Sequence, residues 1–155
     1  MNFINGTFKK NILLLKAKKT LILKLTKAQT TLLNKYVKEK VVNVNKEYED
    51  DRVRFSNTHQ DCLNNVDNIV LGIRPEDIYL DKKYQVETLS EPLNIDCDLS
   101  ELLGHELIVY GYLGKQKIII NTSALNDIKP HTSNQFSFDT TKMYFFDKDS
   151  TNRIK

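Results

Sequence analysis

The sequence predicts a mainly β protein, a small barrel or sandwich with one helix, and three stretches carry this prediction. Leucines alternate with other residues in two short runs within residues 13–25, the period of two that is typical of strands with one buried face. Residues 93–99 repeat the alternation, with apolar side chains up to Leu99 on one face and Asn or Asp on the other. "ELIVYGYL" at 106–113 and "KIII" at 117–120 flank a Gly-Lys-Gln turn, which indicates a hairpin.

One amphipathic helix is expected at residues 27–40. Thr26 and Gln29 have the spacing of a capping box, in which each side chain bonds the backbone N–H of the other residue. Apolar residues then follow at helical spacing. They are Leu32, Leu33, Tyr36 and Val37.

The following residues, 41–67, have a weaker pattern. We expect a hairpin in which Val42 and Val44 face Val53 and Phe55, followed by an Asn-rich surface loop. Two more short strands, "QFSFD" and "KMYFFD", are expected near the end of the chain. The aromatic run Tyr144-Phe145-Phe146 is interpreted as core, with a base-stacking platform as the alternative.

The charge of the chain is uneven along its length. The net charge is +3, but residues 1–40 contain ten lysines and one glutamate, a charge of +9, which leaves −6 for the rest. A basic region can attract nucleic acid or anionic lipid. Because several of these lysines alternate with leucines, we favour a solvated strand face, and we expect no direct nucleic-acid partner.

Signals for catalysis, metal binding and membrane insertion are absent from the sequence. It has no phosphate-binding glycine loop, no serine-nucleophile elbow, no signal peptide and no apolar run long enough to span a bilayer. Cys62 and Cys97 are expected to be free thiols, and the pair His59 and Cys62 offers too few ligands for zinc. The chain by itself therefore reads as a binding or regulatory domain, with no catalytic, cofactor-binding or metal-binding residue.

The stretch "NIVLGIRPEDIYL" at 68–80 is interpreted as a strand that ends in a corner. Pro75 biases Arg74 toward extended backbone and suits the first position of a helical turn. Glu76 and Asp77 then place negative charge in that turn, where the helix dipole favours it. A docking role shared by Arg74 and Glu76 is the alternative.

Four fragments of the sequence resemble one protein family in the same order. They are "MNFI" at 1–4, "VLGIRPEDI" at 70–78, "ELLGHELIVYGYLG" at 101–114 and "IKPHTSNQFSFDTTKMYFFDKDSTNRI" at 128–154. Each is similar to a segment of the C-terminal region in ATP-binding subunits of maltose-type ABC sugar importers. Together they cover much of the chain.

The resemblance implies a regulatory domain with OB-fold-like barrels of the TOBE or MOP type, spanning residues 1–155. It implies a second copy of the chain, the ATPase domain and, indirectly, the membrane permease subunits as partners, at the cytoplasmic face of the plasma membrane. Its motifs also give candidate docking residues. They are Gly72, Arg74, Pro75, Glu76, Leu103, Gly104 and Glu106.

Three departures from the family pattern accompany the resemblance. The ATPase motifs are missing, so ATP and Mg belong to an absent domain, and since Met1 lies inside a family motif we expect an excised domain. Residues 41–67 look like an insertion. A glycine common in the family is missing near His131 and Thr132, where the chain turns after a proline.

The leading hypothesis is a regulatory and dimerising domain of an importer subunit for sugars or polyols. A barrel that senses an oxyanion or metabolite is an alternative, with Thr122-Ser123 and Ser133-Asn134 as the matching polar pairs. A nucleic-acid-binding OB-fold is the third hypothesis. Here the lysines cluster early and the aromatic residues late, which weakens it.

Overall fold

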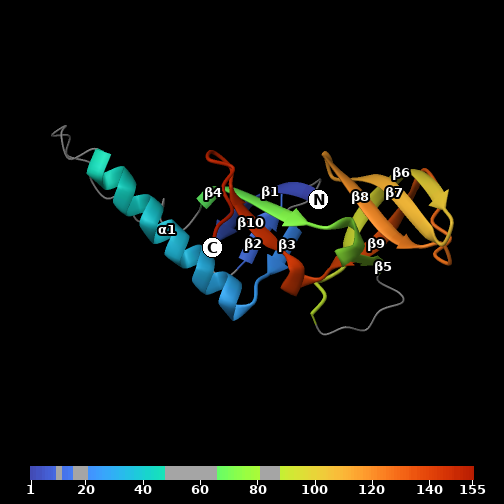
Figure 1. Ribbon diagram of the computed structural model, residues 1–155, viewed down its shortest axis with the longest axis horizontal. Coiled ribbons are helices and arrows are strands. Elements are labelled where there is room, and N and C mark those ends of the chain that lie inside the picture. The colour runs from blue at the N-terminus through green and yellow to red at the C-terminus, as the bar shows by residue number, and fades with distance from the viewer. Residues whose placement is uncertain (10–11, 16–20, 48–65, 81–87) are drawn as a thin grey trace.

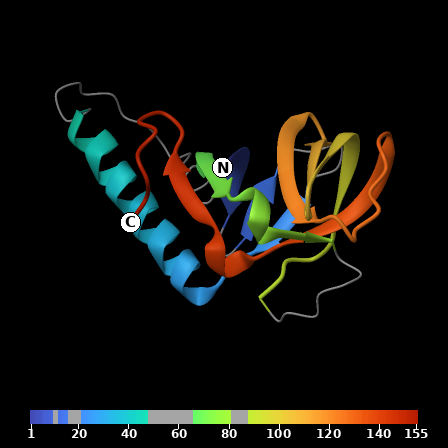
Figure 2. The same ribbon diagram turned by 45° about the vertical axis from the view of Figure 1, so that its right-hand side comes forward.

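Two five-stranded antiparallel sheets and one long helix make up the described part of this computed structural model. The description covers residues 1–9, 12–15, 21–47, 66–80 and 88–155. The helix lies alongside the first sheet, and the second sheet lies at the opposite end of the molecule (Figures 1 and 2). The mainly β prediction is confirmed.

The first sheet combines strands from both ends of the chain. In spatial order its strands are β10 (Tyr144–Asp147), β4 (Val66–Ile73), β1 (Asn2–Lys9), β2 (Ile12–Leu15) and β3 (Leu21–Lys24). The alternation seen in the sequence places Leu13, Leu15 and Leu23 in the core, while the Lys24 side chain is exposed. Strand β1 was not predicted, because the polar residues and glycine of "NFINGTFK" obscure its buried positions.

Helix α1 (Lys27–Glu47) begins where the capping box predicts. The Gln29 N–H donates to Thr26 Oγ1 at 3.3 Å, and the Thr26 N–H donates to Gln29 Oε1 at 3.0 Å. Leu33 and Val37 are buried in the core shared with the first sheet. The hydrogen bonds of the cap and this apolar stripe together fix the start and orientation of the helix.

The helix continues seven residues beyond the predicted end at residue 40. Val42 and Val44 lie in it, so the predicted hairpin with Val53 and Phe55 is wrong. Helix propensity is a weak preference, and an existing helix adds residues more easily than it nucleates, so β-branched residues can extend it. Val53, Phe55, His59 and Cys62 lie outside the described residues.

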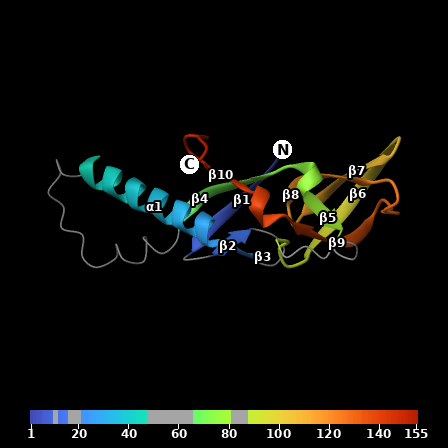
Figure 3. The same ribbon diagram turned by 60° about the horizontal axis from the view of Figure 1, so that its bottom comes forward.

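The second sheet combines two consecutive hairpins with two pairings of strands that lie far apart in the chain. In spatial order its strands are β5 (Ile78–Leu80), β9 (Thr132–Phe138), β6 (Leu93–Leu103), β7 (Glu106–Leu113) and β8 (Gln116–Ser123). Two short 3-10 turns are η1 (Pro75–Asp77) and η3 (Thr140–Lys142). The sheet curls so that its two outer strands, β5 and β8, contact each other (Figure 3).

A β-bulge changes the alternation predicted for β6. The register with β7 shifts between Cys97 and Leu99, so Asp98 is the extra residue. Ile95 and Cys97 point into the core as predicted, but Leu99 is 47% exposed. The prediction for Leu99 is therefore wrong, because a bulge sends the next side chain to the other face of the sheet.

The aromatic run of β10 is divided between the two faces of the first sheet. Phe145 is buried as predicted, whereas Phe146 packs edge-on against Phe3 on the outer face, with ring centroids 5.5 Å apart. A Cβ at Gly72 would come within 2.7 Å of the Phe146 ring. Gly72 is thus needed where the Phe146 ring crosses β4.

Side-chain amides join the two sheets. Asn2 Nδ2 donates to the Ile119 carbonyl oxygen, and the Ile119 N–H donates to Asn2 Oδ1, both at 2.7 Å. The Asn5 N–H donates to Gln116 Oε1 at 2.7 Å. Strand β1 of the first sheet is therefore fixed against the edge strand β8 of the second.

Candidate functional site

The Arg-Pro-Glu segment forms the predicted corner between the two sheets. Arg74 is extended, with φ −77° and ψ 149°, and Pro75 opens the turn η1. The N–H of the first residue in a helical turn has no partner within the turn. Because proline lacks an N–H, Pro75 leaves no unpaired donor at this position. Arg74 Nη1 and Glu76 Oε1 are 3.9 Å apart, and both side chains are more than half exposed, so this ion pair contributes little to stability.

Asp77 has a structural role that the sequence did not reveal. Its side chain is 6% exposed and accepts a hydrogen bond from Lys142 Nζ at 3.0 Å. The Asp77 carbonyl oxygen accepts from the Asp139 N–H at 3.0 Å. Hydrogen bonding to Asp77 raises the pKa of the Lys142 ammonium. The corner is thus tied to η3, which is 65 residues away in the chain.

A groove brings two of the candidate docking residues together. Its volume is about 560 Å³, and it runs from η1 and β5 to the end of the β7–β8 hairpin. Glu76 and Glu106 both line it, with His105, Tyr79 and the apolar side chain of Leu125. The two carboxylates make this groove suited to a cationic or hydrogen-bond-donating group.

The other candidate docking residues lie outside the lining of this groove. Leu103 is 59% exposed near the tip of the β6–β7 hairpin, where Gly104 has φ +64°. A Cβ at Gly104 would meet no atom within 4 Å, so the positive φ alone favours glycine there. Gly72 leaves room for the Phe146 ring, and Pro75 begins the turn η1.

Three of the four residues suggested for an oxyanion bond other groups within the fold. Thr122 and Ser123 line the groove, but Thr122 Oγ1 accepts from Asn126 Nδ2 at 2.6 Å and Ser123 Oγ accepts from the Leu125 N–H at 3.3 Å. Asn134 on β9 bonds Cys97 and Thr132 instead of lining the groove. The carboxylates of the groove also disfavour an anion there.

The turn near His131 adopts the conformation that the family's glycine would favour. His131 has φ +58°, in the left-handed region, and it lies between Pro130 and β9. An L-residue is strained there by roughly 1 kcal/mol relative to glycine. The departure from the family pattern therefore leaves the turn in place.

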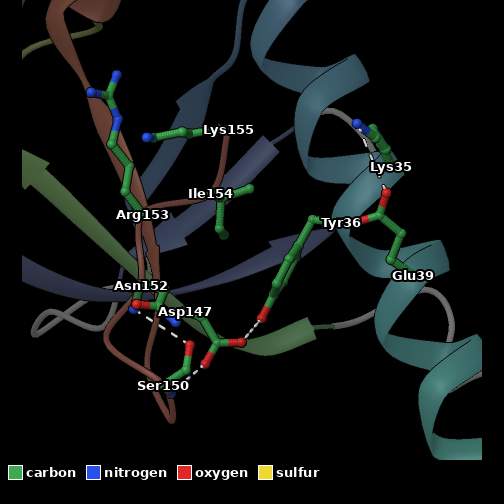
Figure 4. Close-up of a pocket in the computed structure, with 9 residues that line it drawn as sticks. All are labelled: Lys35, Tyr36, Glu39, Asp147, Ser150, Asn152, Arg153, Ile154 and Lys155. Atoms are coloured by element: carbon green, nitrogen blue, oxygen red, sulfur yellow. Dashed lines mark hydrogen bonds and ion pairs between the residues drawn. The ribbon is translucent and has the colours of Figure 1, made fainter.

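A second polar cluster locks helix α1 to the end of the chain, and Figure 4 shows the Tyr36 ring pointing from the helix toward Asp147. Asp147 accepts hydrogen bonds from the Tyr36 hydroxyl and from Lys40 Nζ, the latter at 2.8 Å. The backbone N–H groups of Asp149 and Ser150 donate to its other oxygen, both at 2.8 Å.

These contacts decide the protonation of Asp147. Burial alone would raise the pKa of its carboxyl, but the hydrogen bonds from Lys40, Tyr36 and the backbone hold that pKa well below its usual range. Burial and Asp147 raise the pKa of the Tyr36 hydroxyl. A cavity of about 310 Å³ adjoins the cluster, and among its lining residues Tyr36 and Asp147 bond each other and hold the helix.

The described residues contain no group of three or more His, Cys, Asp or Glu placed to hold a metal ion, and no helix among them is long and apolar enough to cross a membrane. Cys97 is a buried free thiol, as predicted, and burial raises its pKa. Polar features of the described residues are thus the groove and the two ion-pair clusters at Asp77 and Asp147.

Sequence relatives of the chain are transporter subunits. It is 36% identical over 89 residues to the Escherichia coli ABC transporter ATP-binding protein YcjV, and 33% identical over 88 residues to the oligosaccharides import ATP-binding protein MsmX of Bacillus subtilis. The chain is a relative of ABC importer ATP-binding subunits. The multiple sugar-binding transport ATP-binding protein MsmK of Streptococcus mutans is 30% identical over 88 residues. The predicted resemblance is confirmed.

The matched region is only part of each relative. It covers 56% of this chain but 23% of YcjV and 24% of MsmX. No protein-family model matches the chain. The relationship to ABC importer subunits therefore rests on these pairwise similarities.

A solved structure supports the fold. The cytoplasmic molybdate-binding protein ModG, with molybdate bound, superposes with a TM-score of 0.54 at 11% identity, over 93% of this chain and 94% of ModG. At that identity the likeness concerns the fold alone. The OB-fold-like class predicted for this ABC importer relative is confirmed.

Proposed function

We propose that this chain is the regulatory and dimerising region of an ABC importer ATP-binding subunit that serves the uptake of sugars or polyols. Similarity to MsmX and MsmK, two sugar-import subunits, is the observation that carries the proposal. ATP and Mg would be bound by the ATPase domain of the same subunit, and this chain would not hydrolyse ATP alone. The subunit would act at the cytoplasmic face of the membrane with its permease partners.

The arrangement of the two sheets supports a regulatory role for this chain. The two sheets are joined by specific amide and ion-pair contacts, so a protein that binds the exposed corner or groove could influence a second surface through a stiff body. Arg74, Glu76 and Glu106 are exposed and lie on or beside the groove. We propose this groove as the place where a regulator docks.

Sedimentation of a fusion protein tests the dimerising role. An ATPase domain from a related importer would be joined to this chain, and its self-association compared with that of the ATPase domain alone. We expect the fusion to pair more tightly, by at least about tenfold in dissociation constant, or 1.4 kcal/mol. Equal association of the two proteins, together with a chain that stays monomeric, would reject the role.

Oxyanion binding is a second candidate, favoured by the shared fold with a molybdate-binding protein. A thermal-shift series with molybdate, tungstate, sulfate and sugar phosphates tests it, because a ligand that binds the folded state raises the melting temperature. The carboxylates in the groove lead us to expect no shift at millimolar anion. A saturable shift with one oxyanion would favour this candidate instead.

A further inference from the structure

The outer face of strands β6, β7 and β8 carries an apolar row where an antiparallel sheet with one buried face would show polar residues. Leu99 pairs with Tyr110, and Tyr110 pairs with Ile119, so the three side chains lie in one line across the strands. They are 47%, 37% and 41% exposed. The bulge at Asp98 is what brings Leu99 to this face, and bulges commonly re-aim side chains at functional surfaces.

Charges of opposite sign lie at the two ends of a neighbouring row. The next row toward the hairpin turn of β7 and β8 contains Asp96 on β6, Tyr112 on β7 and Lys117 on β8. Asp96 is half-buried and Lys117 is exposed. The acidic and the basic residue thus lie on either side of the central strand, at the same level along it.

This pattern is complementary to itself. A two-fold axis parallel to β7 would lay the face on that of a second copy, with Lys117 over Asp96 of the second copy and Ile119 over Leu99 of the second copy. Tyr110 would lie at the axis, opposite Tyr110 of the second copy. Such isologous pairing is the usual form of a dimer, and sheets packed face to face lie within about 30° of alignment.

The charges also select this axis over the other in-plane axis. An axis perpendicular to the strands through Tyr110 would place Asp96 over Glu101 of the second copy. Like charges brought together in an interface disfavour binding. Glu101 already accepts a hydrogen bond from the Tyr110 hydroxyl at 3.2 Å, which holds it on this face.

We propose that a second copy of this chain binds to the outer face of β6–β8, with the two-fold axis parallel to β7. The proposal rests on the dimerising role proposed above and names the surface and the axis of that contact. Strands about 4.8 Å apart and rows about 7 Å apart give this patch a footprint of roughly 300 Å² per copy. A standard interface buries about 800 Å² per partner, so we expect weak association of the chain alone.

A charge exchange tests the axis. Sedimentation equilibrium at up to about 1 mM chain would compare the wild type with Lys117→Asp, Asp96→Lys and the double variant. Each single reversal should weaken dimerisation at least about tenfold, because it brings like charges together. The double variant should return to within about threefold of the wild type. Single reversals without effect, or a double variant that stays monomeric, would overturn the proposal.

Two isoleucine variants provide a control that involves no change of charge. Ile119→Thr should weaken dimerisation, whereas Ile22→Thr, at a 52% exposed position on β3 of the first sheet, should not. Melting temperatures of all variants check that the monomer still folds. Equal effects of the two isoleucine changes would overturn the proposal.

The outcomes separate this inference from the proposed function. A chain that dimerises regardless of the charge reversals leaves the dimerising role intact and shows that the contact lies elsewhere. Two results together would reject both: a wild-type chain that is monomeric at about 1 mM, and a fusion that pairs no more tightly than the ATPase domain alone.

Discussion

The two sheets of this protein are held together in different ways. Their strand pairings are alike, because each sheet has two consecutive hairpins and two pairings of strands far apart in the chain. The hairpins are β1–β2–β3 in the first sheet and β6–β7–β8 in the second, and the distant pairings are β1–β4 and β4–β10 in the first and β5–β9 and β6–β9 in the second. Side-chain locks reinforce the first sheet, above all the cluster of Tyr36, Lys40 and Asp147. The difference between the sheets therefore lies in this cluster, which ties helix α1 to the end of β10.

Removing the Asp147 charge should give the largest effect and should act on the first sheet. Asp147→Asn breaks a largely buried ion pair with Lys40, so we expect a loss of about 3 kcal/mol in the free energy of unfolding. Denaturant unfolding measures the loss. Amide hydrogen exchange should show the greatest increase in α1 and β10, and the β6–β8 hairpins should change least. Uniform loss of protection would contradict the contrast between the sheets.

The pH dependence of the same variant provides its control. The pKa of Asp147 is lower in the folded chain than in the unfolded chain, where an aspartate titrates near 3.9. Its stabilising contribution is therefore complete above about pH 5 and is lost as the pH falls through the folded value. The difference in stability between wild type and Asp147→Asn should shrink below about pH 4. A constant difference down to that range would exclude the linkage.

Asp77→Asn should have an intermediate effect at the junction of the two sheets. Asp77 is as buried as Asp147, but its partner Lys142 is half exposed and can regain water. We expect a loss of about 1.5 kcal/mol, the usual contribution of a hydrogen bond to a charged group. Chemical denaturation gives the value. A loss larger than that of Asp147→Asn would reverse the ranking of the two locks.

His131→Gly should give the smallest effect and should raise stability. Glycine adopts φ +58° without the strain of roughly 1 kcal/mol, but the added freedom of the unfolded chain offsets about 0.4 to 1 kcal/mol of this gain, so we expect a net gain of at most about 0.5 kcal/mol. A rise in melting temperature with hydrogen-exchange changes confined to the start of β9 is the expected result. As a matched control, Gly104→Ala at φ +64° should be destabilising.

Local features of the fold were predictable from the sequence because their causes lie within a few residues. The Thr26–Gln29 cap, the β7–β8 hairpin and the Pro75 corner each depend on neighbouring residues, and each was found where expected. The length of α1 was not predicted, since the propensity of the valines after residue 40 opposes a helix.

Features that depend on distant residues could not be predicted. Asp147 lies 107 residues after Lys40, and Lys142 lies 65 residues after Asp77, so no spacing rule connects them. The groove unites Glu76 and Glu106, which the family resemblance had named separately. The bulge at Asp98 left the pattern of β6 superficially regular, and only pairing with β7 shows that Leu99 faces outward.

Asn2 has a consequence for how the molecule avoids unwanted association. Its amide bonds both the N–H and the carbonyl of Ile119 on the edge strand β8, as the peptide group of a sixth strand would do. An edge strand is otherwise a template for any extended chain that passes. Asn2 therefore occupies the backbone hydrogen-bonding positions of Ile119 that a foreign strand would need in order to add to the sheet there.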